Sequence, residues 1–212
     1  MAKRPRLLVT GFGPFPRMPR NPSAAAAGRV AASPRWRILG VEADALVLPT
    51  TYTALNTMLD LALEAGGFDA VLMLGVASRA RTIRMERRAV NRASVLFPDA
   101  AGRHPSQVAM RRGAPYRLTR AALTPALVAL RRRGLVVALS QDAGRYLCNA
   151  AYGRALARPA PALFVHVPKS PRAAQPVAHR TRRRLGWRDQ LVAGLADVAL
   201  GLLRQARAYP RR

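Results

Sequence analysis

The sequence predicts an open three-layer α/β/α sandwich built on a mostly parallel, twisted sheet. Short apolar runs alternate along the chain with amphipathic segments that are long enough to form helices. Half of the 212 residues are hydrophobic, which is sufficient for one sizeable core. No linker-like composition or internal repeat divides the chain, so we expect a single domain over residues 1–212.

The first half of the chain shows this alternation clearly. The run "RLLVT" ends at a cluster of glycine and proline, after which Asn21 is a suitable cap for a helix that begins at Pro22. In the next helix, apolar residues recur at helical spacing before Gly66 and Gly67 close it. The expected elements are a strand at 6–10, a helix from Pro22, a strand within 37–50, a helix within 51–67 and a buried strand at 69–75.

The middle of the chain, from Val76 to Tyr116, is less regular. It contains Pro98, Pro105 and Pro115, so we expect loops or a hairpin over one end of the sheet. The alternation then resumes. The expected elements are a helix at 124–134, a strand at 135–140, a helix at 148–157, a strand at 162–168 and a long amphipathic helix at 187–206.

Composition excludes several classes of site. A single cysteine cannot form an internal disulfide or a zinc site built on several thiolates. No stretch approaches the ~20 apolar residues of a membrane span. Gly11, Gly13 and Pro14 interrupt the first apolar run, so we expect no secretory signal and a cytoplasmic protein.

The charge is unusual, because 36 Lys and Arg against 10 Asp and Glu give a formal net charge of +26. Such a chain is expected to bind polyanions nonspecifically at low salt. The cations are nevertheless spread along the chain. The densest runs, at Arg131–Arg133 and from His179 to Arg188, are interpreted as a helix end and a solvated loop. Nucleic-acid binding stays open as the alternative.

Three residues are candidates for chemistry, because polar groups after the strands of an α/β sheet collect in one crevice. Cys148 falls at the start of an expected helix, where the helix N-terminus favours a thiolate. His166 lies at the end of an apolar strand, and Glu86 is the only acid in an arginine-rich stretch. Each also has an ordinary structural explanation, as a buried thiol, a core histidine and a surface ion pair. Together they make a nucleophile, base and orienting acid possible.

Four motifs resemble the pyroglutamyl peptidase type I family of cysteine peptidases. They are "VTGFGPFPRMPRNPS", "ERRAVN" with "FPDAAGRHP", "SQDAGRYLCNAAYG" and "FVHVP", in the family's order and approximate spacing up to about Pro168. The resemblance implies the α/β/α fold and the activity of a hydrolase, specifically a thiol protease and omega peptidase. It implies hydrolysis after an N-terminal pyroglutamyl residue, with peptides as substrates and no cofactor or metal. It also implies a homo-oligomer, either a dimer or a tetramer.

The resemblance assigns roles to individual residues. Glu86, Cys148 and His166 occupy the catalytic positions, with the thiol attacking and an acyl-enzyme as intermediate. Asn21 is interpreted as a structural cap that fixes the substrate loop. The positions that line the pocket for the pyroglutamyl ring are Phe12, Phe15, Thr50, Val76, Phe97, Tyr146 and Leu147.

The sequence also departs from the family pattern. The family's glycine-rich turn after the third strand is "GVASRAR" here, with Ser78 and Arg79 in place of two glycines. Arg79 or Arg145 near the pocket could favour a substrate with an acidic group beyond the ring. Two alternatives to the peptidase therefore remain: a diverged relative that acts as a binding protein, and a polyanion-binding protein on the same scaffold.

Overall fold

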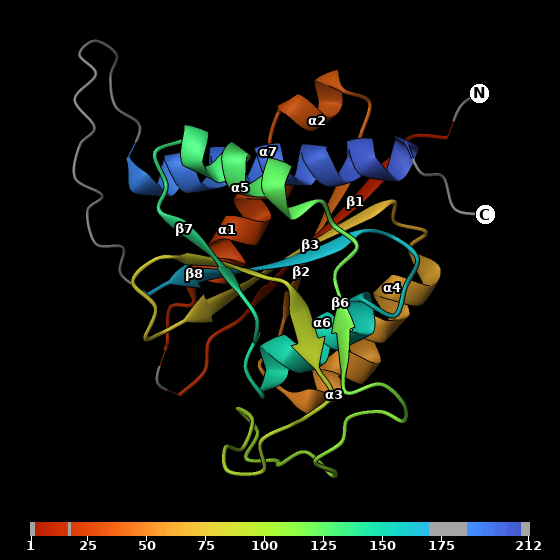
Figure 1. Ribbon diagram of the computed structural model, residues 1–212, viewed down its shortest axis with the longest axis vertical. Helices are drawn as coiled ribbons and strands as arrows, with labels where there is room; N and C mark the ends of the chain where they lie inside the picture. Colours follow the sequence, from red (N-terminus) through yellow and green to blue (C-terminus); the bar gives the residue numbers. More distant parts are fainter. Residues whose placement is uncertain (1–2, 17, 170–185, 209–212) are drawn as a thin grey trace.

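The computed structural model describes residues 3–16, 18–169 and 186–208. It is a mixed, mostly parallel six-stranded sheet with helices on both faces (Figure 1), which confirms the predicted three-layer sandwich. The strands are β1 (Arg6–Phe12), β2 (Glu42–Leu48), β3 (Ala70–Ala77), β4 (Ile83–Glu86), β7 (Val137–Ser140) and β8 (Ala162–Pro168), arranged in the order β2-β1-β3-β8-β4-β7. A separate antiparallel pair joins β5 (Arg88–Val90) and β6 (Tyr116–Leu118).

The strands do not all run in one direction. β1, β2, β3 and β8 are parallel to one another, whereas β4 is antiparallel to β8 and parallel to β7 at the sheet edge. The β4–β7 pair therefore runs opposite to the rest of the sheet. Because of this reversal, Arg84 of β4 lies opposite His166 of β8, and Glu86 lies opposite Phe164.

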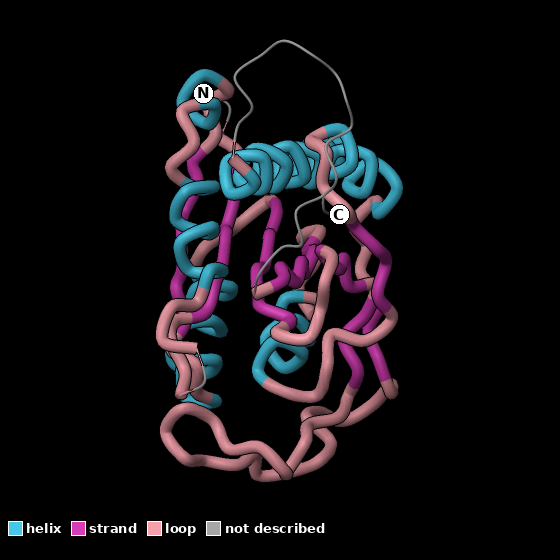
Figure 2. Tube along the Cα trace, turned by 90° about the vertical axis from the view of Figure 1, so that its left-hand side faces the viewer, coloured by secondary structure: helices cyan, strands magenta, loops and turns pink. Residues whose placement is uncertain are grey.

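The helices form the outer layers. One face is covered by α1 (Pro22–Ala31), α5 (Leu123–Arg132) and α7 (Trp187–Ala208), and α2 (Arg35–Ile38) packs its Trp36 into the same core. The other face is covered by α6 (Leu147–Ala155) and by the segments α3 (Tyr52–Ala54), η1 (Leu55–Asp60) and α4 (Leu61–Ala65). Figure 2 shows the sheet between these two helical layers. Burial of apolar side chains on both faces stabilises the sandwich.

The predicted cap of α1 is confirmed. Asn21 Oδ1 accepts a hydrogen bond from Ser23 N at 3.1 Å, and Asn21 Nδ2 donates to Gly13 O at 3.0 Å. The same residue thus satisfies a free amide of the helix and holds the glycine-rich loop after β1. Gly11 lies so close to this helix start that an added Cβ would be 2.5 Å from Ser23 O.

The structure differs from the sequence-based expectation in the helix after β2 and in the strand β4 that the middle segment adds to the sheet. The helix expected within 51–67 is continuous in space but widens to a π-helix over Leu55–Asp60. The middle segment was expected to contain loops or a hairpin. It contributes β4 to the main sheet, and β5 pairs with β6 across the long loop 91–115.

The arginine run at Arg131–Arg133 closes α5, as expected for a helix end. Most of the second run, residues 179–185, lies outside the described residues. Within the described ranges, no helix has the length and apolar character needed to cross a membrane.

Candidate active site

Cys148 lies in the first turn of α6. Tyr146 is the N-cap with extended backbone angles, and no side chain caps this helix end. The amides of the first turn therefore remain directed at the space around the thiol, and their partial positive charge favours an anion there. The side chain of Cys148 is partly buried, and it packs against the second core cluster together with Tyr146.

Gly75 of β3 provides the space for the thiol. A Cβ added at Gly75 would lie 3.0 Å from Sγ of Cys148 and 2.8 Å from two ring carbons of Phe164. A side chain at this position would push the sulfur or the Phe164 ring away. The glycine within an apolar strand thus marks a close approach between the strand and α6.

His166 lies beside the thiol, on β8, where it pairs with Gly75 of β3. Its Nδ1 is 2.8 Å from Glu86 Oε1, and both side chains are almost completely buried. The Cys148 thiol is near enough to the imidazole to affect its pKa. Since Nδ1 is directed to the carboxylate, Nε2 is the ring nitrogen left for the thiol. The structure therefore brings the three predicted residues close together, with a direct contact between His166 and Glu86.

The pKa of His166 is raised from 6.5 to about 9. Burial alone lowers this pKa, because it disfavours the charged imidazolium. Hydrogen bonds and electrostatic attraction from Cys148 and Glu86 outweigh that effect. The imidazole is therefore held in the protonated form near neutral pH, between two groups that can carry negative charge.

Glu86 contacts His166 across two antiparallel strands, an arrangement that the sequence did not indicate. We expected each of the three residues near the carboxyl end of a strand at a common edge. Because β4 is antiparallel to β8, Glu86 pairs with Phe164, and Arg84 is the residue opposite His166. The Glu86 carboxylate crosses diagonally from β4 to the imidazole. Its backbone carbonyl accepts a hydrogen bond of 2.9 Å from Tyr152 Oη of α6, which ties this strand to the helix.

Comparison with known proteins identifies the family. The model of the family described as pyroglutamyl peptidase matches residues 5–182, most of the chain. The chain belongs to the pyroglutamyl peptidase family. It is by that membership a cysteine peptidase.

Curated relatives and solved structures agree with this assignment. The pyrrolidone-carboxylate peptidase of Gloeobacter violaceus is 34% identical over 175 residues, which cover 80% of this chain and 84% of that protein. That of Chromobacterium violaceum is 34% identical over 93% of both chains. The pyrrolidone carboxyl peptidase of Thermus thermophilus superposes with a TM-score of 0.73 at 30% identity, covering 92% of this chain and 98% of that one. The Thermococcus litoralis enzyme, with a TM-score of 0.80 at 24% identity, covers 98% of this chain and 96% of its own and shows the same fold.

Several residues that the pyroglutamyl peptidase resemblance places around the substrate lie on the Cys148 side of the sheet. Phe12 and Leu147 are buried in the second core cluster, and Tyr146 packs against it. The Tyr146 ring is edge-on to that of Tyr52, with the ring centroids 6.2 Å apart. Burial, Tyr52, Asp99 and Cys148 together raise the pKa of Tyr146 to about 12, so its hydroxyl stays neutral. That hydroxyl donates to Pro98 O at 2.8 Å and holds the loop that carries Phe97.

The other members of this set have different surroundings. Thr50 Oγ1 donates to Gly13 O at 3.1 Å and fixes the loop that carries the half-buried Phe15. Phe97 is 60% exposed. Val76 packs against the first core cluster, on the opposite face of the sheet from Cys148. The structure therefore places Phe12, Tyr146 and Leu147 on the Cys148 side of the sheet and directs the Val76 side chain to the other side.

The departure at "GVASRAR" forms a short turn in the structure. Ala80 N donates to Ala77 O at 2.9 Å, with Ser78 and Arg79 exposed between them. The turn thus closes with a backbone hydrogen bond although neither central residue is glycine. Arg145 is also exposed, in the loop that precedes α6.

Sequence reasoning missed the structural role of Asn149. This residue is fully buried, accepts from Val90 N at 2.8 Å, and donates to Val90 O and Arg92 O at 2.8 and 3.2 Å. It joins α6 to β5 next to the thiol, so it does not orient His166. Asp142, in the loop before α6, accepts a hydrogen bond from Gly144 N at 2.8 Å. The position of this polar residue directly after the cysteine was the sequence feature that could have indicated its role.

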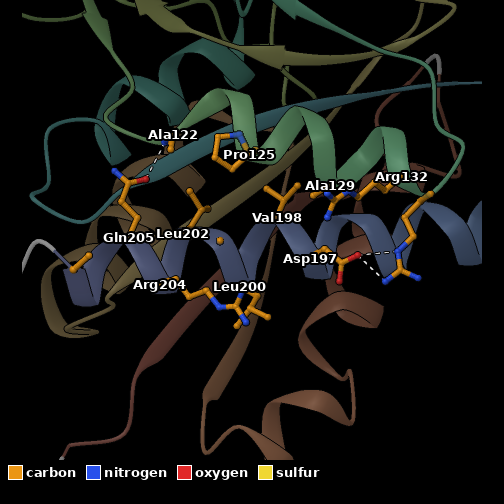
Figure 3. A pocket seen from close by; sticks show the side chains of 14 residues that line it. Ala122, Pro125, Ala129, Arg132, Asp197, Val198, Leu200, Leu202, Arg204 and Gln205 are labelled. Atoms are coloured by element: carbon orange, nitrogen blue, oxygen red, sulfur yellow. Dashed lines mark hydrogen bonds and ion pairs between the residues drawn. The ribbon is translucent and has the colours of Figure 1, made fainter.

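A groove lies between α5 and α7 (Figure 3), the helices that cover the face of the sheet opposite to Cys148. It is lined by alanine, leucine and arginine residues and by Asp197, which forms ion pairs with Arg35 and Arg133. None of the predicted site residues lines it. In the part of the chain that the structure describes, no group of three His, Cys, Asp or Glu side chains is arranged to hold a metal ion.

Proposed function

We propose that this chain is a cysteine exopeptidase that removes an N-terminal pyroglutamyl residue from peptides, with Cys148 as nucleophile, His166 as acid and base, and Glu86 as positioning residue. The observation that carries the proposal is the buried contact of 2.8 Å between His166 Nδ1 and Glu86 Oε1, with the Cys148 thiol over the neighbouring Gly75. Cys148 is the only cysteine in the chain, so a cysteine peptidase has no other thiol to use. Relatives named pyrrolidone-carboxylate peptidase support the choice of substrate.

In the first step the Cys148 sulfur forms a bond to the carbonyl carbon of the pyroglutamyl residue. The proton that the thiol has given to His166 passes to the leaving amine as the carbon–nitrogen bond breaks. The raised pKa of His166 suits this role, because the imidazolium is available to the leaving amine at neutral pH. The amides at the start of α6 are suitable donors for the oxyanion that forms on the carbonyl oxygen.

In the second step water attacks the thioester. His166 accepts a proton from that water, the carbon–sulfur bond breaks, and pyroglutamate leaves with the thiolate restored. Glu86 keeps Nδ1 protonated and the ring oriented throughout, so that Nε2 faces the reacting atoms. No step requires a metal or an organic cofactor.

The pyroglutamyl ring is a compact, neutral lactam, so its pocket needs apolar walls and a few amide partners. Phe12, Leu147 and Tyr146 provide apolar and aromatic surface beside Cys148. Thr50 and Asn21 act indirectly, since both hold Gly13 and the loop that leads to Phe15. The nearby carboxylate of Asp99 is occupied by hydrogen bonds from the backbone amides of Tyr52, Ala101 and Arg103.

The test is hydrolysis of a chromogenic pyroglutamyl anilide by the wild type and by Cys148→Ala at moderate salt. We expect turnover by the wild type and loss of at least about a thousandfold in the variant, because removal of the nucleophile abolishes covalent catalysis. Equal rates would contradict the assignment of Cys148. An intact fold with no turnover by the wild type would favour the alternative of a diverged binding protein.

A further inference from the structure

Three residues lie in one row across the sheet, on the face that carries α6. Gly75 of β3 pairs with His166 of β8, and His166 pairs with Arg84 of β4. Arg84 is two residues before Glu86 on the same strand, so its side chain leaves the same face of the sheet as the Glu86 carboxylate. Residues opposite each other on antiparallel strands have Cβ atoms about 5 Å apart. Arg84 is therefore the direct cross-strand neighbour of His166, on the side away from the thiol.

The residues of this row differ in solvent exposure. Gly75 and His166 are buried, whereas Arg84 and its neighbour on β7, Ala138, are exposed. β7 forms the edge of the sheet at this point (Figure 1). We call the surface formed by Arg84 and Ala138 the Arg84 ledge. It is open to solvent and directly adjoins the imidazole.

The Arg84 guanidinium is free to meet a ligand. Among the described residues, no hydrogen bond or ion pair holds this side chain, although other arginines of the chain are paired with carboxylates. The nearest carboxylate on its own strand, Glu86, is engaged by His166. Asp142, in the loop between β7 and α6, accepts from the Gly144 amide.

The direction of the scissile bond follows from the proposed function, on which this inference rests. The pyroglutamyl ring is placed on the side of Phe12, which belongs to β1 and so lies across β3 from His166. The thiol stands over Gly75, between the two. The leaving amine must be near His166 to receive its proton, so the peptide continues from the thiol past the imidazole. The Arg84 ledge is the surface beyond it.

We propose that Arg84 is a specificity-determining residue that favours peptides with Asp or Glu directly after the pyroglutamyl residue. An exposed ion pair of this kind is worth about two- to fivefold in kcat/KM. Its strength falls as salt screens it. A lysine or arginine after the pyroglutamyl residue meets repulsion at the same place.

The experiment compares two C-terminally amidated peptides, pyroglutamyl-Glu-Ala-amide and pyroglutamyl-Gln-Ala-amide, which differ by one carboxylate. We expect the wild type to cleave the Glu peptide with a kcat/KM about two- to fivefold higher at low salt, and the ratio to approach one as salt rises. Arg84→Gln is expected to lower this ratio, and Arg84→Lys to preserve most of it.

The matched control is Arg37→Gln on α2, an exposed arginine beside β2 at the other edge of the sheet. It removes the same charge from the protein, so it reports the effect of net charge alone, and the ratio should stay at the wild-type value. An unchanged ratio in Arg84→Gln, or an equal decrease in Arg37→Gln, would overturn the role of Arg84. Absence of cleavage of both peptides by the wild type would instead contradict the proposed function itself.

Discussion

At the scale of single residues, the absence of a side chain at Gly75 is as important as the presence of the thiol. Gly75→Ala is expected to displace the sulfur or the Phe164 ring, because the added Cβ would lie 3.0 Å from Sγ and 2.8 Å from the ring. We predict a loss of kcat of about tenfold or more, since small displacements of reacting groups are costly. Steady-state kinetics with the pyroglutamyl anilide measures it.

Gly28→Ala is the control for this substitution. Gly28 lies inside α1 with nothing within 4 Å of an added Cβ, so alanine should stabilise the helix by about 0.4–1 kcal/mol and leave kcat unchanged. Wild-type kcat in Gly75→Ala would show that the thiol does not need the space over the strand.

The pairing of Glu86 with His166 predicts a pH dependence. The raised pKa of His166 means that the protonated ring is lost as pH rises through about 9, so kcat/KM should fall on that alkaline limb. In Glu86→Gln the partner is neutral, and the limb should move to lower pH while turnover drops by about 10- to 100-fold. A pH–rate profile of each protein measures both effects.

Glu64→Gln removes the same charge from a surface ion pair with Arg158, and it should leave the profile in place. An unmoved alkaline limb in Glu86→Gln would mean that Glu86 does not control the imidazole. The same raised pKa contributes to stability. Its contribution is complete below about pH 6.5, the ordinary value, and is lost as pH rises through about 9.

At the scale of secondary-structure elements, Asn149 holds the active-site helix to β5. Asn149→Ala leaves the amide and carbonyl of Val90 without their buried partner. We predict a decrease of about 2–4 kcal/mol in the free energy of unfolding, measured by urea denaturation. Asn56→Ala is the comparison, because Asn56 is exposed and its loss should cost at most about 0.5 kcal/mol. Similar decreases in the free energy of unfolding for both variants would contradict the structural role of Asn149.

The strands and helices that sequence reasoning predicted best are those with strong local patterns. The cap at Asn21, the strand before Gly75 and the strand that carries His166 each follow from neighbouring residues, and the structure confirms them. The direction of β4 could not be obtained in this way, because strand pairing depends on long-range contacts. For the same reason, the sequence did not predict the diagonal contact between Glu86 and His166 or the position of Arg84 opposite His166.

The direction of individual side chains was the second feature that the sequence did not predict. The family resemblance grouped Val76 with the pocket residues, but strand alternation turns its side chain toward the opposite core cluster. The expected helix within 51–67 widens to a π-helix at Leu55–Asp60, and its apolar periodicity alone did not indicate this change. Both differences arise from backbone geometry that residue types do not specify.

At the scale of the whole molecule, the net charge of +26 predicts polyanion binding that is strong at low salt and nonspecific. Among the described residues, exposed arginines occur on several elements, including Arg37 on α2, Arg84 on β4 and Arg204 on α7. We expect the affinity for duplex DNA of arbitrary sequence to fall by about 10³-fold or more between 50 and 200 mM salt. Fluorescence anisotropy measures it, and tight, sequence-dependent binding at the higher salt would support the polyanion-binding alternative.

In the proposed mechanism Cys148 becomes acylated by the pyroglutamyl group. Acid quenching during turnover, followed by proteolysis and mass spectrometry, tests it directly. We predict a pyroglutamyl thioester on the peptide that contains Cys148, absent from Cys148→Ala, which should also have lost turnover. A pyroglutamyl group on any other side chain, or turnover at the wild-type rate in Cys148→Ala, would contradict this mechanism.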